Sequence, residues 1–202
     1  MRRLWLLLPL LAAACASPEP RYFTLDAVPG PALPAALPSV ELRRPGLAGY
    51  LDRQDVVRSS AGYTVAIARG DRWAEPLGDL IGRVLARDLA QRLPGTAVFT
   101  AGGALSAEPA MHIDLDIQRF DTERAATSTG TAAGAVVLRA QFDLIPRHGA
   151  QLPVCAFEAI QPLAGEGTAA QAAAMSGALG QLAERLAAAL RDLGANLPPG
   201  CP

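Results

Sequence analysis

The thiol of Cys15 is the group in this sequence whose surroundings indicate one particular reaction. It follows Arg2 and Arg3, an apolar run over residues 4–11, and three alanines at 12–14. A charged end, a short apolar segment and small residues at a cleavage site are typical of a secretion signal peptide, and the apolar run is too short for a mature membrane span. The pattern predicts cleavage before Cys15 and attachment of a diacylglycerol to its thiol. The alternative is an ordinary signal peptide with an incidental cysteine.

The segment resembles the lipobox of bacterial lipoproteins. Ala12 stands where that motif usually has leucine, and Leu11 lies one residue earlier. The residue after the cysteine is Ala16 rather than aspartate, which by the enterobacterial sorting rule implies the outer membrane. The resemblance therefore divides the chain into a signal peptide (1–14), a lipidated tether (15–20), a folded domain (21–196) and a C-terminal tail (197–202).

Two further cysteines, Cys155 and Cys201, remain as candidates for a disulfide. Thiol pairs in an oxidising compartment such as the periplasm are often bridged. A bridge would hold the tail against a predicted strand. The alternative is two unpaired thiols, one of them buried. We do not expect a catalytic thiol, because no motif places a histidine beside either cysteine.

Polar side chains alternate with apolar ones between residues 111 and 121, where His112, Asp114 and Asp116 share one face. Together with Asp143 on a later segment, they could hold a metal ion or act as paired carboxylates. The same alternation is typical of any half-exposed antiparallel strand, and this is the interpretation that we favour. We therefore predict no metal ion, no cofactor and no catalytic residue, and we expect that the protein is not an enzyme.

The charge of the chain argues against nucleic acid as a partner. The 18 basic residues, all of them arginine, are balanced by 19 acidic residues, for a net charge of −1. The arginines form no basic run and are not interleaved with an aromatic stripe, as nucleic-acid-binding surfaces require.

The hydrophobic pattern predicts two helices. Apolar residues between Leu77 and Leu93 lie on one face of a helix that has Pro76 in its first turn and ends at Pro94. Its opposite face is predicted to be exposed and carries Arg83, Arg87, Asp88, Gln91 and Arg92. A second amphipathic helix is predicted over 168–193, with Thr168 and Gln171 as a capping box.

Alternating or β-rich segments predict the strands. They cover residues 21–27, 39–43, 63–68, 96–100, 111–121, 136–144 and 153–161, and residues 50–58 form a loop that leads into a short strand. The order of elements predicts an α/β fold of the segregated, α+β-like kind. It has a mixed, largely antiparallel sheet with the two main amphipathic helices packed on one face.

Three segments carry a likeness to a known family: YFTLD at 22–26, YLDRQDVVR at 50–58 and DRWAEPL at 71–77, with FD at 120–121 as a weaker fourth. Together they resemble the auxiliary lipoproteins of ABC-type transport systems, the PqiC-like family. The sequence departs from the family pattern at Gln54, where proline usually follows the arginine of the second motif.

This resemblance implies a non-catalytic periplasmic lipoprotein on the outer membrane. Its partners would be an MCE-domain (PqiB-like) protein, which forms a tunnel across the periplasm, and an inner-membrane ABC transporter. The cargo would be phospholipid or a similar hydrophobic molecule, and self-assembly into a homo-oligomeric ring is compatible with this role. The candidate docking residues are Tyr50, Leu51, Asp52, Arg53, Arg72, Trp73, Glu75 and Pro76. Of these, Trp73 could instead be a core residue over the start of the helix.

Two other functions compete with this one. A periplasmic adaptor for cell-wall synthesis would also lack chemistry, but it should show a basic or aromatic groove. A lipid-anchored hydrolase would need a catalytic constellation. The sequence shows neither feature, and only the hypothesis of a transport auxiliary lipoprotein accounts for the three motifs.

Overall fold

A computed structural model describes residues 19–34, 37–61, 64–102, 108–124, 134–149 and 152–194 of the chain. The signal peptide, Cys15, Cys201 and the tail therefore lie outside the described residues. Their predicted roles stay predictions.

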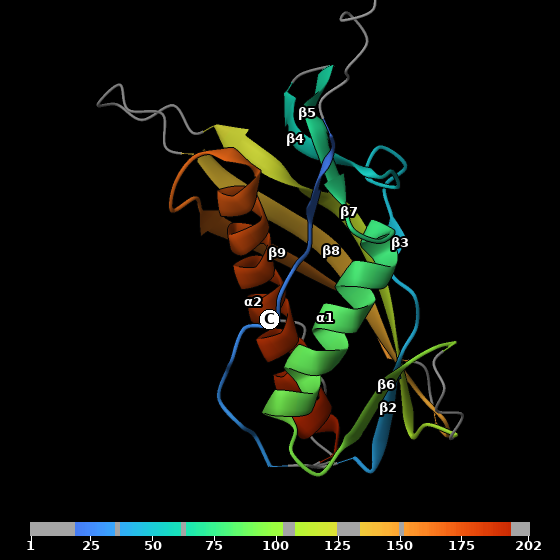
Figure 1. Cartoon of the computed structure of the whole chain (residues 1–202). Coiled ribbons are helices and arrows are strands. Elements are labelled where there is room, and N and C mark those ends of the chain that lie inside the picture. The colour runs from blue at the N-terminus through green and yellow to red at the C-terminus, as the bar shows by residue number, and fades with distance from the viewer. Residues whose placement is uncertain are drawn as a thin grey trace, which may run out of the picture.

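The described chain folds into one mixed sheet with two helices on one face (Figure 1). The elements are β1 (Arg21–Phe23), β2 (Ser39–Leu42), β3 (Gly46–Leu47), β4 (Asp55–Ala61), β5 (Thr64–Trp73), α1 (Leu77–Arg92), β6 (Ala97–Thr100), β7 (Met111–Arg124), β8 (Gly134–Pro146), β9 (Cys155–Pro162) and α2 (Gly167–Gly194). The predicted fold class is confirmed.

The long strand β7 organises the sheet. Along one edge it pairs antiparallel with β8 from Met111↔Pro146 to Arg124↔Gly134, and β8 pairs in turn with β9. Its other edge is shared by β2, β3 and β4, each of which pairs with it in parallel. Strand β4 then continues through β5 to β1, and β2 continues to β6. The parallel pairs make the sheet mixed, as predicted.

Apolar side chains from both helices and from the inner face of the sheet form the core. In α1, Leu80, Ile81 and Leu85 are fully buried, and so are Leu182 and Leu186 in α2. These residues recur at intervals of three to four, as expected for helices that bury one face. They pack against the inward-facing residues of β7 and β8, so the helices and the sheet share one continuous core.

Two local predictions about the helices are wrong. Asp88 and Arg92 were predicted on the exposed face of α1, yet they are 0% and 2% exposed because an N-terminal segment covers them. Thr168 lies inside α2 rather than before it, and the side chains of Thr168 and Gln171 hydrogen-bond to Asp71 and to the Val57 carbonyl. They therefore join the helix to the sheet instead of capping it.

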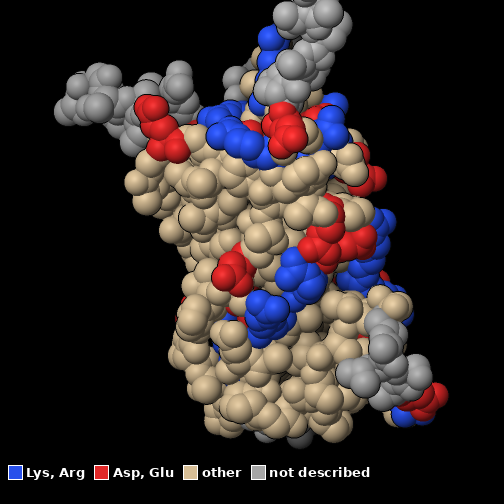
Figure 2. Space-filling view, viewed as in Figure 1, with Lys and Arg blue, Asp and Glu red and all other residues tan. Residues whose placement is uncertain are grey.

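Charged side chains are unevenly distributed on the face that carries the helices. Figure 2 shows them at the end of the molecule where β4 and β5 project and in a band on the α1 side, while much of the remaining face is uncharged. No helix among the described residues is long and apolar enough to span a membrane.

Candidate partner-docking surface

The three sequence motifs meet on neighbouring strands. Tyr22 of the first motif lies opposite Arg72 of the third in the parallel β1–β5 pair. On the other side of β5, Arg72 lies opposite Asp55 of the second motif. Residues that face each other across paired strands share one face of the sheet. The motifs, which are far apart in the sequence, therefore form one row across β1, β5 and β4.

Backbone hydrogen bonds join the segment that leads into α1 to the chain on both sides of it. The N–H of Trp73 donates to the carbonyl of Gln54 at 2.8 Å, and the N–H of Ala74 donates to the carbonyl of Phe23 at 2.8 Å. The Trp73 side chain is 3% exposed and that of Leu51 is 1% exposed. Both of these candidate docking residues therefore lie in the core, beneath the row of motif residues.

Tyr50 connects the second motif to the weaker motif on β7. Its hydroxyl donates to Asp121 Oδ2 at 2.8 Å, and Arg119 Nε donates to Asp121 Oδ1 at 3.0 Å. Burial, followed by the hydrogen bond to the Asp121 carboxylate, raises the pKa of Tyr50 to about 12. The phenol therefore remains a hydrogen-bond donor across the physiological pH range, and Tyr50 holds the loop onto the sheet.

Asp71 stands at the buried side of the same strands. It accepts hydrogen bonds from Arg21 Nε at 2.8 Å and from the hydroxyl of Thr168 at the start of α2. Burial alone would raise its pKa, but the hydrogen bonds from Thr168 and Arg21, with the charge of Arg21, lower the pKa below the ordinary value. The ionised carboxylate thus ties β1, β5 and α2 together.

Five motif residues on or beside β1, β4 and β5 form what we call the motif surface: Tyr22, Asp52, Arg53 and Arg72, which are exposed, and Asp55, which is half-buried. Arg53 Nη2 approaches Asp55 Oδ2 to 3.6 Å. Arg72 is exposed and makes no ion pair with any residue that the structure describes. An arginine without an intramolecular partner keeps its five donors available for a carboxylate or a phosphate.

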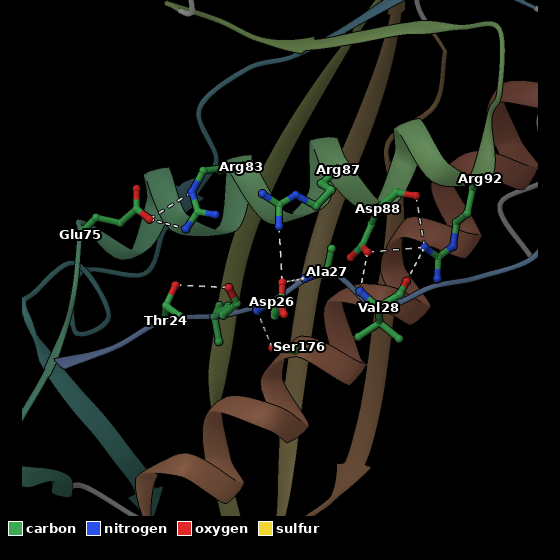
Figure 3. Close-up of polar contacts among 11 residues, drawn as sticks. Thr24, Asp26, Ala27, Val28, Glu75, Arg83, Arg87, Asp88, Arg92 and Ser176 are labelled. Atoms are coloured by element: carbon green, nitrogen blue, oxygen red, sulfur yellow. Dashed lines mark hydrogen bonds and ion pairs between the residues drawn. The ribbon is translucent and has the colours of Figure 1, made fainter. Parts of the chain in front are cut away.

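The two remaining candidate residues lie where the chain enters α1. Glu75 accepts a hydrogen bond from Arg83 Nε at 3.1 Å, one of the contacts in Figure 3. Pro76 occupies the N-cap position and is exposed. Glu75 is therefore engaged within the chain, whereas Pro76 borders the motif surface.

The segment of residues 24–34, which we call the strap, runs between α1 and α2 (Figures 1 and 3). The Asp26 N–H donates to Ser176 Oγ on α2 at 3.1 Å. The Val28 N–H donates to Asp88 Oδ1 on α1 at 2.7 Å, and Arg92 Nη1 donates to the Val28 carbonyl at 2.9 Å. Side chains of the two helices thus replace the strand partners that the strap lacks. No periodic pattern in the sequence predicts these contacts, which only the burial of Asp88 and Arg92 reveals.

Burial beneath the strap shifts the pKa of Asp88. Burial raises the pKa of Asp88 above its ordinary value, against the opposing effects of the Val28 N–H and the Arg92 charge. The Asp88 and Arg92 side chains approach to 3.6 Å. A carboxylate so placed is a candidate for protonation rather than for catalysis, because substrate could not reach it.

The polar face of β7 is held by paired side chains. His112 Nδ1 lies 2.8 Å from Glu41 Oε2, and Arg43 Nη1 lies 3.1 Å from Asp114 Oδ2. Within the described ranges, no three His, Cys, Asp or Glu side chains are placed to hold a metal ion. Two of the side chains that raised the question of a metal site, His112 and Asp114, are thus paired with side chains of β2 or the residue that follows it.

A cleft of about 450 Å³ opens at the other end of β7. Its walls include Met111, Pro146, Arg147, His148 and Leu193. None of the motif residues lines this cleft, so the motif surface and the cleft are separate features.

Solved structures share this fold. The crystal structure of an uncharacterized protein superposes with a TM-score of 0.65 at 18% identity, covering 85% of this chain and 98% of that one. Protein XCC0632 from Xanthomonas campestris, of family DUF330, superposes with a TM-score of 0.66 at 20% identity, covering 84% and 93%. A PelC dodecamer from Paraburkholderia phytofirmans reaches a TM-score of only 0.39 at 15% identity, covering 77% and 92%, and supports no argument about this chain. No curated protein matches the sequence.

The fold and the surface define a two-helix α+β domain of the kind seen in XCC0632. More specifically, the chain belongs to the family of ABC-type transport auxiliary lipoprotein components, whose model matches residues 23–187. It is therefore an auxiliary lipoprotein of an ABC-type transport system and is anchored to a membrane. The resemblance drawn from the motifs is confirmed.

Proposed function

We propose that this lipoprotein is anchored by Cys15 to the periplasmic side of the outer membrane and docks an MCE-domain (PqiB-like) protein of a lipid transport system. The observation that carries the proposal is the convergence of the three motifs on one surface. The motifs are the part of the sequence that resembles the PqiC-like family, and each of the three contributes a residue to the row Tyr22, Arg72 and Asp55 across β1, β5 and β4.

The motif surface has the properties of a modest docking site. It offers the aromatic ring of Tyr22, which is 62% exposed, beside the unpaired guanidinium of Arg72. Aromatic residues and arginine are enriched in protein interfaces and often dominate their binding energy. A small surface can suffice, because the lipid anchor confines this chain to the membrane and raises its effective concentration for a partner that reaches that membrane.

A non-catalytic role is supported by the way in which the polar candidates are used. His112, Asp114 and Asp121 are each paired with a neighbouring side chain on the sheet or its loops. The Cys155 sulfur is in a disulfide, so it cannot act as a nucleophile. The protein would thus act by binding and anchoring. A homo-oligomeric ring stays a prediction.

The test is a pull-down in mild detergent with the full-length, lipidated protein, followed by mass spectrometry. We expect the MCE-domain protein to be recovered with the unaltered chain and to be strongly depleted with Arg72→Glu. Arg147→Glu is the matched control, because Arg147 is also an exposed arginine but lies beside the cleft at the other end of β7.

Three outcomes separate the alternatives. Loss of the MCE-domain protein with Arg72→Glu alone supports docking through the motif surface. Equal recovery with both variants would contradict that site. Recovery of wall synthases without any MCE-domain protein would replace the transport role with that of a cell-wall adaptor.

A further inference from the structure

We propose that the projecting end of the β4–β5 hairpin rests on the membrane that holds the lipid anchor and binds the headgroups of anionic phospholipids. This inference rests on the anchoring of Cys15 in the proposed function. It assigns to the hairpin a second contact with the bilayer, made by Val65, Ile67 and Arg69.

The first argument is the direction of the strands. Because β1 and β5 are parallel and Arg21 pairs with Asp71, the chain before Arg21 leaves the domain on the side toward which the earlier residues of β5 extend. In Figure 1, β1 and the projecting hairpin lie at the same end of the molecule. The chain therefore enters β1 from the side on which the hairpin projects.

The second argument is reach. Arg21 lies six positions after Cys15, and an extended chain spans at most about 20 Å over six positions. Val65 likewise lies six positions before Asp71 along β5, and at the rise of a strand this distance is again about 20 Å. The hairpin thus extends as far beyond Arg21 as the tether can stretch. A domain held by this tether keeps the hairpin end close to the bilayer surface.

The third argument is the chemistry of the hairpin. Val65 and Ile67 are 43% and 38% exposed, and because residues two apart on a strand point to the same side, they form an exposed apolar pair on one face of β5. Arg69 is exposed and, like Arg72, makes no ion pair with the residues that the structure describes. By contrast, Arg83 and Arg87 in the charged band on α1 are each paired with a carboxylate.

These properties fit an interfacial lipid surface. Apolar side chains that enter the acyl boundary beside an arginine at headgroup level are typical of proteins that lie on a membrane. The guanidinium can hold a phosphate with two hydrogen bonds. A protein partner bearing carboxylates is the competing occupant, and the tether length favours the bilayer over it.

The test uses the full-length, lipidated protein reconstituted into vesicles of phosphatidylethanolamine and phosphatidylglycerol. Val65→Cys carries an environment-sensitive fluorophore, and lipids with a quencher on the acyl chain report contact with the bilayer. Val154→Cys is the matched control, because Val154 is also an exposed valine, at 58%, but precedes β9 on the far edge of the sheet. We expect strong quenching at position 65 and little at position 154.

Charge provides the second readout. Arg69→Gln should weaken the contact about fivefold, as expected for the loss of one arginine at an anionic surface, whereas Arg69→Lys should retain it. Vesicles of phosphatidylcholine alone should reduce the quenching in the same way, and so should high salt.

Failure of the inference and failure of the proposed function give different results. Protein that does not float with vesicles is not lipid-anchored, and this result overturns both. Protein that floats but shows equal quenching at positions 65 and 154 overturns the hairpin contact alone. Quenching at position 65 that appears only after the MCE-domain protein is added assigns the hairpin to a protein partner and also overturns it.

Discussion

The two halves of this domain share one apolar core but differ in the buried contacts that are added to it. In the half formed by β7, β8, β9 and α2, the contact is apolar: Phe120, Leu138 and Phe142 lie fully buried under the alanine- and leucine-rich helix. In the half formed by β1, β5, β4, the strap and α1, buried polar groups make the connections. Asp71 joins β1 to α2, and Asp88 joins the strap to α1.

This difference determines how precisely the elements of each half are positioned. Apolar packing tolerates small shifts, because many weak contacts can be exchanged for others. A buried carboxylate tolerates few, because its donors must remain within hydrogen-bond distance. The polar half contains the segment that follows the lipidated tether and the motif surface. Its contacts therefore fix the positions of this segment and of the motif surface relative to the rest of the domain.

The largest expected effect is in the apolar half. Phe142 is 1% exposed in the centre of β8, and Phe142→Ala should lower the free energy of unfolding by about 3–5 kcal/mol because it leaves a cavity. Denaturant unfolding followed by circular dichroism measures this change. A loss below about 1 kcal/mol would mean that the apolar half relaxes around the cavity and contributes less than the comparison requires.

The second effect concerns the covalent link in the same half. Cys155 is disulfide-bonded, and its partner lies outside the described residues. We predict that Cys201 is the partner and that Cys201→Ser lowers stability by about 2–4 kcal/mol, since a long loop is no longer closed in the unfolded chain. Peptide mapping without reduction identifies the pair directly. A Cys155 peptide joined to anything other than the C-terminal peptide contradicts the assignment.

The third effect moves to the polar half. Asp71→Asn should lower stability at neutral pH by about 1–3 kcal/mol, because the ion pair with Arg21 and the acceptor for Thr168 are weakened while both groups remain. The pKa of Asp71 is lowered in the fold, so its contribution is present above the unfolded pKa and disappears as the pH falls through the folded value.

Stability curves of the two proteins at several pH values measure this prediction. The difference between the unaltered protein and Asp71→Asn should shrink on acidification. A difference that is constant with pH would show that the asparagine disturbs packing rather than charge.

The comparison also explains how much could be predicted from the sequence. The meander was visible because β7 and β8 alternate apolar and polar residues and both helices repeat apolar residues every three to four positions. These are properties of single segments, and apolar burial follows from them directly. The motifs likewise identified the family before their arrangement in space was known.

The polar half was poorly predicted because its contacts join segments that carry no periodic signal. The strap has no regular structure, the two-residue strand β3 was not predicted, and β5 extends to Trp73, beyond the predicted limit of residue 68. Asp88 and Arg92 were predicted to be exposed, because the pattern of α1 alone contains no information about a segment that covers them. A charged pair four residues apart, beside apolar neighbours, was the one available signal.

The smallest expected effect separates the two buried carboxylates of the polar half. The pKa of Asp88 is raised chiefly by burial, so its ionised form is a cost to the fold at neutral pH. In Asp88→Asn the side-chain carbonyl can still accept the Val28 N–H, and Arg92 keeps its hydrogen bonds to the Val28 and Asp88 carbonyls. We therefore expect stability at pH 7 to change by less than about 1 kcal/mol.

The pH dependence has the opposite sign to that of Asp71, because a raised pKa stabilises the unaltered protein at low pH and that gain is lost as the pH rises through the folded value. On acidification, the stability of the unaltered protein relative to Asp88→Asn should thus increase. Its stability relative to Asp71→Asn should decrease. Parallel pH profiles for the two variants would mean that the strap and the β1–β5 pair are held by the same kind of contact.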